Sequence, residues 1–123
     1  MRLCLEHGAD VNWANEEGET VLYDACADGH VEVARLLLDN GAEVDRAVSK
    51  GRQEGQTPLW IACREGHVDA ARLLLDNDAD ADQTVKGTTP LDIAQKKGHS
   101  AVVALLNEYE NRLIELYLAE HQE

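Results

Sequence analysis

Three histidines recur along the chain in a pattern that invites comparison with a metal site. His30, His67 and His99 each follow a glycine. Imidazole is a common zinc ligand, but one zinc ion needs its ligands within about 2.3 Å. If each histidine has the same place in stacked units, successive rings should lie about one helix-packing distance apart, roughly 8–10 Å. We therefore predict a hydrogen bond at a helix boundary for each histidine, and no metal site.

Alternating aspartates form a second candidate metal site, at Asp76, Asp78, Asp80 and Asp82. A calcium-binding loop needs glycine at its sixth position and glutamate at its twelfth. Counting from Asp76 finds Ala81 and Gly87 at these positions. We therefore interpret the stretch as the tail of a repeat that has drifted toward aspartate, and we predict no metal and no cofactor.

The three cysteines are odd in number and include no closely spaced pair, which does not favour a disulfide framework. Cys26 and Cys63 occupy equivalent places in neighbouring units, farther apart than the roughly 7 Å that a disulfide allows between Cα atoms. We expect both to be small buried thiols, and Cys4 to replace a packing leucine. This cysteine usage predicts a reducing intracellular compartment, cytoplasmic with the nucleus left open.

Catalytic signatures are absent from the sequence. The phosphate-binding pattern ending in Gly-Lys-Ser/Thr does not occur, nor do Gly-x-Ser-x-Gly and His-Glu-x-x-His. We therefore predict that the chain is not an enzyme.

Composition limits the partners of this 123-residue chain, whose length suits one domain. Eleven basic and 24 acidic side chains give a formal charge of -13. Such a surface repels phosphate backbones and anionic lipid heads. The longest apolar run, residues 101–106, is too short to cross a bilayer. We predict a protein partner, and neither nucleic acid nor a membrane.

Three sequence blocks recur in a fixed order, which indicates an internal repeat. The first block is Arg-Leu-x-Leu followed by a tail such as Gly-Ala-Asp-Val-Asn, and it occupies residues 2–12, 35–45 and 72–82. The second has Thr-Pro-Leu-x-x-Ala as its clearest form and occupies 18–26, 55–63 and 87–95. The third is Gly-His. Four residues are added between Asp45 and Thr57, and one is lost between Asp82 and Thr89.

Each unit is predicted to contain two short helices, because residues suited to helix ends bound them. Threonine hydroxyls suit the first N-cap, at Thr20, Thr57 and Thr89. Proline then fits the first helical position, at Pro58 and Pro90. Glycines that allow a left-handed backbone end the first helix at Gly29, Gly66 and Gly98, and the second at Gly41. Asp78 replaces the last of these, at a cost of about 1 kcal/mol.

Helix pairs this short bury a core only by stacking on one another. Thr-Pro-Leu-x-x-Ala, Gly-His, Leu-Leu and Gly-Ala-Asp-Val-Asn together resemble ankyrin repeats, over about residues 2–106. The resemblance implies an all-α solenoid of stacked helix-turn-helix units with projecting loops. It also implies a non-catalytic role in protein binding, through the loop tips and the concave first-helix face. The position usually held by histidine is Tyr23, Trp60 or Asp92 here, which implies that an inter-repeat hydrogen bond is missing.

We expect a single domain over residues 1–123. Its predicted parts are a partial repeat at 1–15, repeats at 16–52, 53–84 and 85–106, and a C-terminal capping helix extension at 107–123. The extension is inferred from apolar residues spaced alternately by three and four, from Val102 to Leu116. The chain starts inside a second helix, and we expect this uncapped half-repeat to contact upstream repeats or another chain.

Aligning the units selects loop-tip and first-helix positions that stacking leaves free. The predicted partner-binding residues are Trp13, Glu16, Glu17, Glu19, Tyr23, Asp28, Arg52, Gln56, Trp60, Arg64, Lys86 and Lys96. Residues 3–34 hold eight acids and no Lys or Arg, whereas residues 46–53 hold three bases and no acid. The face should therefore run from acidic to basic, and would orient a segment with the opposite gradient. Solvating charge is the other interpretation.

Three points stay open at this level. Each tryptophan is either a partner-binding hot spot or a packing residue, with Trp60 beside Tyr23 and Trp13 on a neighbouring loop. The enlarged loop at residues 46–54 is either a functional finger or neutral length drift. For the whole chain, the alternative to a protein-binding module is a structural or oligomerising segment of a larger repeat array.

Overall fold

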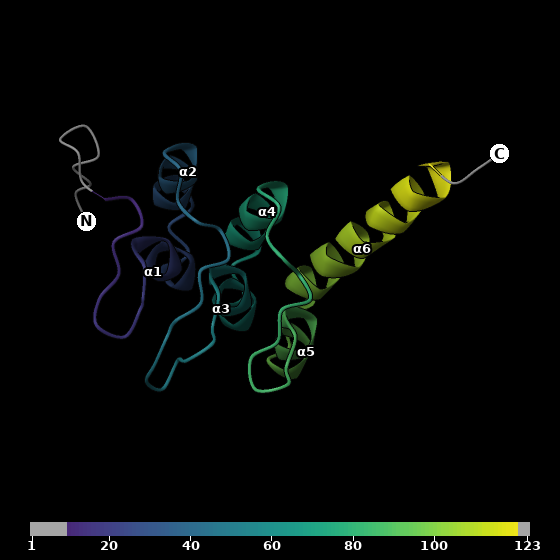
Figure 1. Cartoon of the computed structure of the whole chain (residues 1–123). Helices are drawn as coiled ribbons and strands as arrows, with labels where there is room; N and C mark the ends of the chain where they lie inside the picture. Colours follow the sequence, from purple (N-terminus) through teal and green to yellow (C-terminus); the bar gives the residue numbers. More distant parts are fainter. Residues whose placement is uncertain (1–9, 121–123) are drawn as a thin grey trace.

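The computed structural model describes residues 10–120, and this part of the chain folds into three helix pairs (Figure 1). The helices are α1 (Val21–Asp28), α2 (Val31–Asp39), α3 (Pro58–Glu65), α4 (Val68–Asp76), α5 (Pro90–Lys96) and α6 (Ser100–Glu120). Within these residues the only extended pairings are two isolated β-bridges, in the loops before α1 and α5. The all-α fold class is thereby confirmed.

The first helix of each pair begins where the threonine spacing predicts. The hydroxyl of Thr20 accepts a hydrogen bond from the backbone N–H of Tyr23 at 3.0 Å. Thr57 and Thr89 accept the corresponding bonds at 3.2 and 3.0 Å. Each bond satisfies one of the N–H groups that a helix start leaves without a partner inside the helix.

Left-handed residues end the helices and turn the chain. Gly29 and Gly66 follow α1 and α3 with φ of 74° and 78°. Gly41 follows α2 with φ of 91°, and Asp78 has φ of 67° at the equivalent place after α4. The left-handed aspartate predicted from the repeat is confirmed.

Stacking arranges the helices in two rows (Figure 1). One row is α1, α3 and α5, and the other is α2, α4 and α6, with each helix in contact with its neighbour in the row and with its pair. The central positions are fully or almost fully buried, including Leu22, Leu37, Leu59, Leu74 and Val102. A single apolar core therefore runs through all three units.

Histidines join each unit to the one before it. The ring Nε2 of His67 hydrogen-bonds the carbonyl of Ala27 at 3.1 Å, and that of His99 bonds the carbonyl of Arg64 at 2.9 Å. The predicted helix-boundary bond is confirmed at these two positions. Among residues 10–120 no three metal-ligating side chains gather into a possible metal site.

The expected loss of an inter-repeat hydrogen bond beside the first helices is wrong for two of the three units. The hydroxyl of Tyr23 donates to Oε1 of Gln56 at 2.6 Å. The indole Nε1–H of Trp60 donates to the carbonyl of Thr88 at 3.1 Å. The side chains of Tyr23 and Trp60 are thus long enough to form hydrogen bonds with the next unit.

The alternating aspartates belong to the repeat tails. Both carboxylate oxygens of Asp45 accept the backbone N–H of Asp80 at 3.1 Å, and Asp80 accepts that of Asp82 at 2.9 Å. Burial is the main cause that raises the pKa of the Asp45 carboxyl. These carboxylates serve as hydrogen-bond acceptors between and within the repeat tails.

The last helix is longer than its counterparts and differs from the expected cap. α6 continues without a break to Glu120, but residues 110–120 are all exposed. Figure 1 shows this stretch extending away from the stack. The predicted contact of the N-terminal half-repeat, and Cys4 with it, falls at residues 1–9, outside the described residues. Within the described part, no helix has the length and apolar character to span a bilayer.

Candidate functional site

Three loops project on the same side of the molecule, each leading into a helix of the first row (Figure 1). They comprise residues 12–20, 46–57 and 82–89. We call these loops, with the exposed sides of α1, α3 and α5, the first-helix face. All twelve predicted partner-binding residues belong to its loops and helices.

The tip of the first loop is held by one asparagine. Oδ1 of Asn15 accepts the backbone N–H groups of Glu17 and Glu19, at 3.0 and 2.9 Å. This turn leaves the side chains of Glu16 and Glu17 exposed. Trp13 is 59% exposed. A large aromatic and two carboxylates therefore face solvent on an ordered loop.

The enlarged second loop is bound to the first. The backbone N–H groups of Ser49 and Lys50 and the hydroxyl of Ser49 all donate to the carbonyl of Glu17, at 2.9 to 3.1 Å. Val48 is buried, and its backbone pairs with Gln56 and Gly55. Residues of the enlarged loop thus fix the second loop to the first through hydrogen bonds.

Three of the predicted partner-binding residues lie in the packed layer beneath the face. Tyr23, Gln56 and Trp60 are 4%, 7% and 6% exposed, and the bonds between units described above hold them. Burial, with Glu19 and Asp24 adding to it, raises the pKa of Tyr23 to about 12. The packing interpretation therefore describes Trp60 better than a protruding hot spot, since its ring is buried and its indole N–H bonds the carbonyl of Thr88.

The other nine residues reach the surface. Those that are exposed are Trp13, Glu16, Glu17, Asp28, Arg52, Lys86 and Lys96. Glu19 and Arg64 are partly buried. Sequence alignment of the units therefore separated surface from core correctly at most positions, and failed where a large side chain bridges two units.

Acidic groups gather at the α1 end of this face. Glu16, Glu17, Glu19, Asp24 and Asp28 all lie in or near the first loop and α1. The pKa of Asp24 is raised by burial first, and then by the nearby charges of Glu19 and Asp28. Because these carboxylates repel one another, a positively charged group of a partner would be attracted to this end of the face.

A groove of opposite charge lies between the second and third units. Its volume is about 500 Å³, and five cations line it: Arg52, Arg64, Lys86, Lys96 and Lys97. Four of them are predicted partner-binding residues, and the fifth is Lys97. Trp60, Val85 and Ile93, each 6% exposed, lie at its floor. We call this feature the basic groove.

Neither described cysteine is suited to nucleophilic chemistry. Cys26 and Cys63 are free and fully buried. Burial raises the pKa of each thiol to about 12, so both stay protonated near neutral pH. The sequence expectation of small buried thiols is confirmed for this pair.

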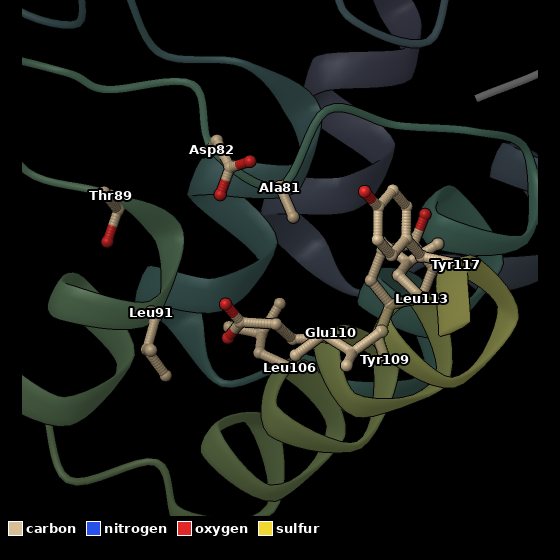
Figure 2. Close-up of a pocket in the computed structure, with 10 residues that line it drawn as sticks. Ala81, Asp82, Thr89, Leu91, Leu106, Tyr109, Glu110, Leu113 and Tyr117 are labelled. Carbon is tan, nitrogen blue, oxygen red and sulfur yellow. The ribbon is translucent and has the colours of Figure 1, made fainter. Parts of the chain in front are cut away.

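A second hollow, of about 460 Å³, lies beside the exposed part of α6. Figure 2 shows Tyr109, Leu113 and Tyr117 on the helix side, with Ala81 and Asp82 on the loop side. The regular apolar spacing in this helix signalled the continuation. That spacing did not reveal that Leu113, Ile114, Leu116 and Leu118 would stay exposed.

Similar stretches occur in curated proteins of several kinds. Over 50 residues the chain is 50% identical to mouse protein fem-1 homolog A-like. It is 43% identical over 47 residues to the potassium channel AKT1 of Oryza sativa subsp. indica, and 39% over 51 residues to mouse protein phosphatase 1 regulatory subunit 27. The matches cover 39%, 38% and 42% of this chain, but the chain spans only 8%, 5% and 33% of those proteins.

One family model covers almost the whole chain. The model described as Ankyrin repeats (3 copies) matches residues 1–48 and 44–115. These ranges contain all three recurring sequence blocks, and the described part of them forms the stacked helix pairs. The chain therefore belongs to the ankyrin repeat family.

Proposed function

We propose that this chain is a non-catalytic module that binds another protein across its first-helix face. Ankyrin repeats are generally protein-interaction modules rather than enzymes, which sets the class. The observation that carries the proposal is the placement of nine surface residues, of types suited to recognition, on ordered loops and one row of helices. Rigid loops lose little entropy when they bind.

Charge along the face supports an oriented partner. The acidic groups lie on the first loop and α1, whereas the cations of the basic groove lie between the second and third units. A partner segment with the opposite order of charges is attracted in one direction and repelled in the other. The two buried free thiols are in keeping with a reducing, intracellular compartment.

A matched pair of triple variants tests the proposal. The face variant combines Trp13→Ala, Glu16→Ala and Lys86→Ala, and the control combines Leu36→Ala, Glu32→Ala and Arg72→Ala on the second row. All six side chains are exposed. Removing a central aromatic often costs about 2 kcal/mol of binding. We expect the affinity of proteins captured from a lysate to fall at least about tenfold for the face variant and by less than about threefold for the control.

Equal loss in both variants, or undiminished binding by the face variant, would contradict the proposal. Circular dichroism of both variants checks that the fold is unchanged.

An oligomerising role is the second candidate, since α6 carries exposed apolar side chains. Leu113, Ile114, Leu116 and Leu118 are 48–57% exposed. Such side chains on an extended helix suit helix–helix association. Sedimentation at high concentration separates the candidates, because a monomer there removes this one.

A further inference from the structure

The basic groove collects positive charge against the composition of the chain. Five of the chain's eleven Lys and Arg residues line it, and none of the acidic residues within the described range 10–120 does. The cations come from both sides: Arg52 from the second loop and Arg64 from α3 on one side, and Lys86, Lys96 and Lys97 of the third unit on the other. Positive charge is thus concentrated in this groove, although the chain as a whole carries a formal charge of -13.

The N–H donors of these five side chains have no partner within the described range 10–120. Arg46 elsewhere donates to the carbonyl of Asn12, and Arg112 pairs with Glu108 at 3.9 Å. By contrast, none of the five groove side chains forms a hydrogen bond or ion pair with another residue of the described range 10–120. A neighbouring anion therefore meets charge that no internal carboxylate neutralises.

The floor of the groove is rigid and partly apolar. Trp60 is fixed by its bond to Thr88, and Gln56 by its bond from Tyr23. Val85 and Ile93 are buried beside the indole. A bound segment thus meets mainly cations, with a small apolar area between them. The volume of the groove, about 500 Å³, suits several side chains.

One cation is held by a turn that lysine adopts at a cost. Val85 and Thr88 exchange backbone hydrogen bonds of 2.8 and 3.0 Å around Lys86 and Gly87, whose φ angles are 52° and 80°. Two positive φ values are typical of a two-residue hairpin turn, which favours Asn-Gly. The turn carries Lys86 to the wall of the groove.

We propose that the basic groove binds an acidic segment of a partner protein, rich in Asp and Glu with an apolar side chain among them. This inference rests on the proposed function, because it names the chemistry that one part of the first-helix face recognises. A long polyanion such as nucleic acid would also meet the acidic end near α1, which repels it. A short acidic segment that ends before α1 avoids that repulsion.

The test uses a fluorescein-labelled octapeptide of Glu and Asp with a central Leu, titrated with the whole chain and followed by anisotropy. A peptide with Gln and Asn in place of the acids is the neutral control. We expect saturable binding of the acidic peptide alone, weakening as added salt screens the charges. In an NMR spectrum of the chain, the indole N–H signal of Trp60 should shift while that of Trp13 stays in place.

Two charge-reversal variants locate the binding. Arg64→Glu with Lys96→Glu alters the groove, and Arg35→Glu with Arg72→Glu makes the same change in net charge on the second row. We expect the groove variant to lose at least about tenfold in affinity and the control less than about twofold.

Three results would overturn the inference: equal loss in both variants, equal binding of the neutral peptide, or equal displacement by inorganic phosphate or a single-stranded oligonucleotide. If captured partner proteins still bind the groove variant but no longer bind a Trp13→Ala variant, the proposed function stands and only this inference fails.

Discussion

Replacing Leu74 with alanine is expected to lower the free energy of unfolding by about 2–5 kcal/mol, because a fully buried leucine leaves a cavity in the core. Leu74 lies in α4, the second-row helix that contacts both α2 and α6. Domains of this size are stable by only about 5–15 kcal/mol, so the loss is a large share of the total. Urea denaturation followed by far-UV circular dichroism measures it.

Leu36→Ala is the control for this change. Leu36 belongs to the equivalent helix, α2, but is 46% exposed. Its replacement should cost less than about 1 kcal/mol, since the lost side chain was half in water. A loss at Leu74 no larger than that at Leu36 would show that the second row does not hold the core.

Gly66→Ala is expected to cost about 2–4 kcal/mol, because the new methyl group would strike the next unit. A Cβ at Gly66 would lie 2.6 Å from Nδ1 of His99, the ring that bonds the carbonyl of Arg64. The left-handed backbone, with φ of 78°, adds its own penalty. Both the unfolding free energy and the NMR signals of the His99 ring report the change.

Gly98→Ala separates the two causes. Gly98 has φ of 76°, but a Cβ there would meet no other atom within 4 Å. Its replacement should therefore show only the backbone cost of about 1 kcal/mol. Equal losses at Gly66 and Gly98 would contradict the close contact between successive units that the histidine bonds indicate.

Local features of the fold were predictable from the sequence. Thr20, Thr57 and Thr89 cap helices as predicted because a cap depends on residues within one turn. Asp78 turned out left-handed because the repeat placed it at a glycine position. Stacking also followed from the pattern, since equivalent segments bury equivalent faces.

Features that depend on the reach of a side chain across two units were not predictable. The repeat alignment selected Tyr23 and Trp60 as partner-binding positions, but could not show that they bond Gln56 and Thr88 of the next unit. The spacing of apolar residues predicted the continuation of α6, but not its exposure, because burial depends on what lies beside the helix.

The shape of the candidate site could not be predicted from the sequence, although the repeat alignment selected the positions that line it. Arg52, Arg64, Lys86 and Lys96 were selected as separate surface positions, and the structure brings them around one groove. Charge counts along the chain showed the gradient from acidic to basic. The depth of the groove, its buried floor and the unpaired state of its cations depend on packing between units.

Hydrogen–deuterium exchange of the chain with and without a captured partner tests most directly whether the first-helix face binds protein. Slower exchange in the complex is expected for backbone amides of residues 12–20, 49–57 and 85–97, with α2 and α4 unchanged. Protection confined to α2, α4 or the exposed part of α6 would contradict the claim.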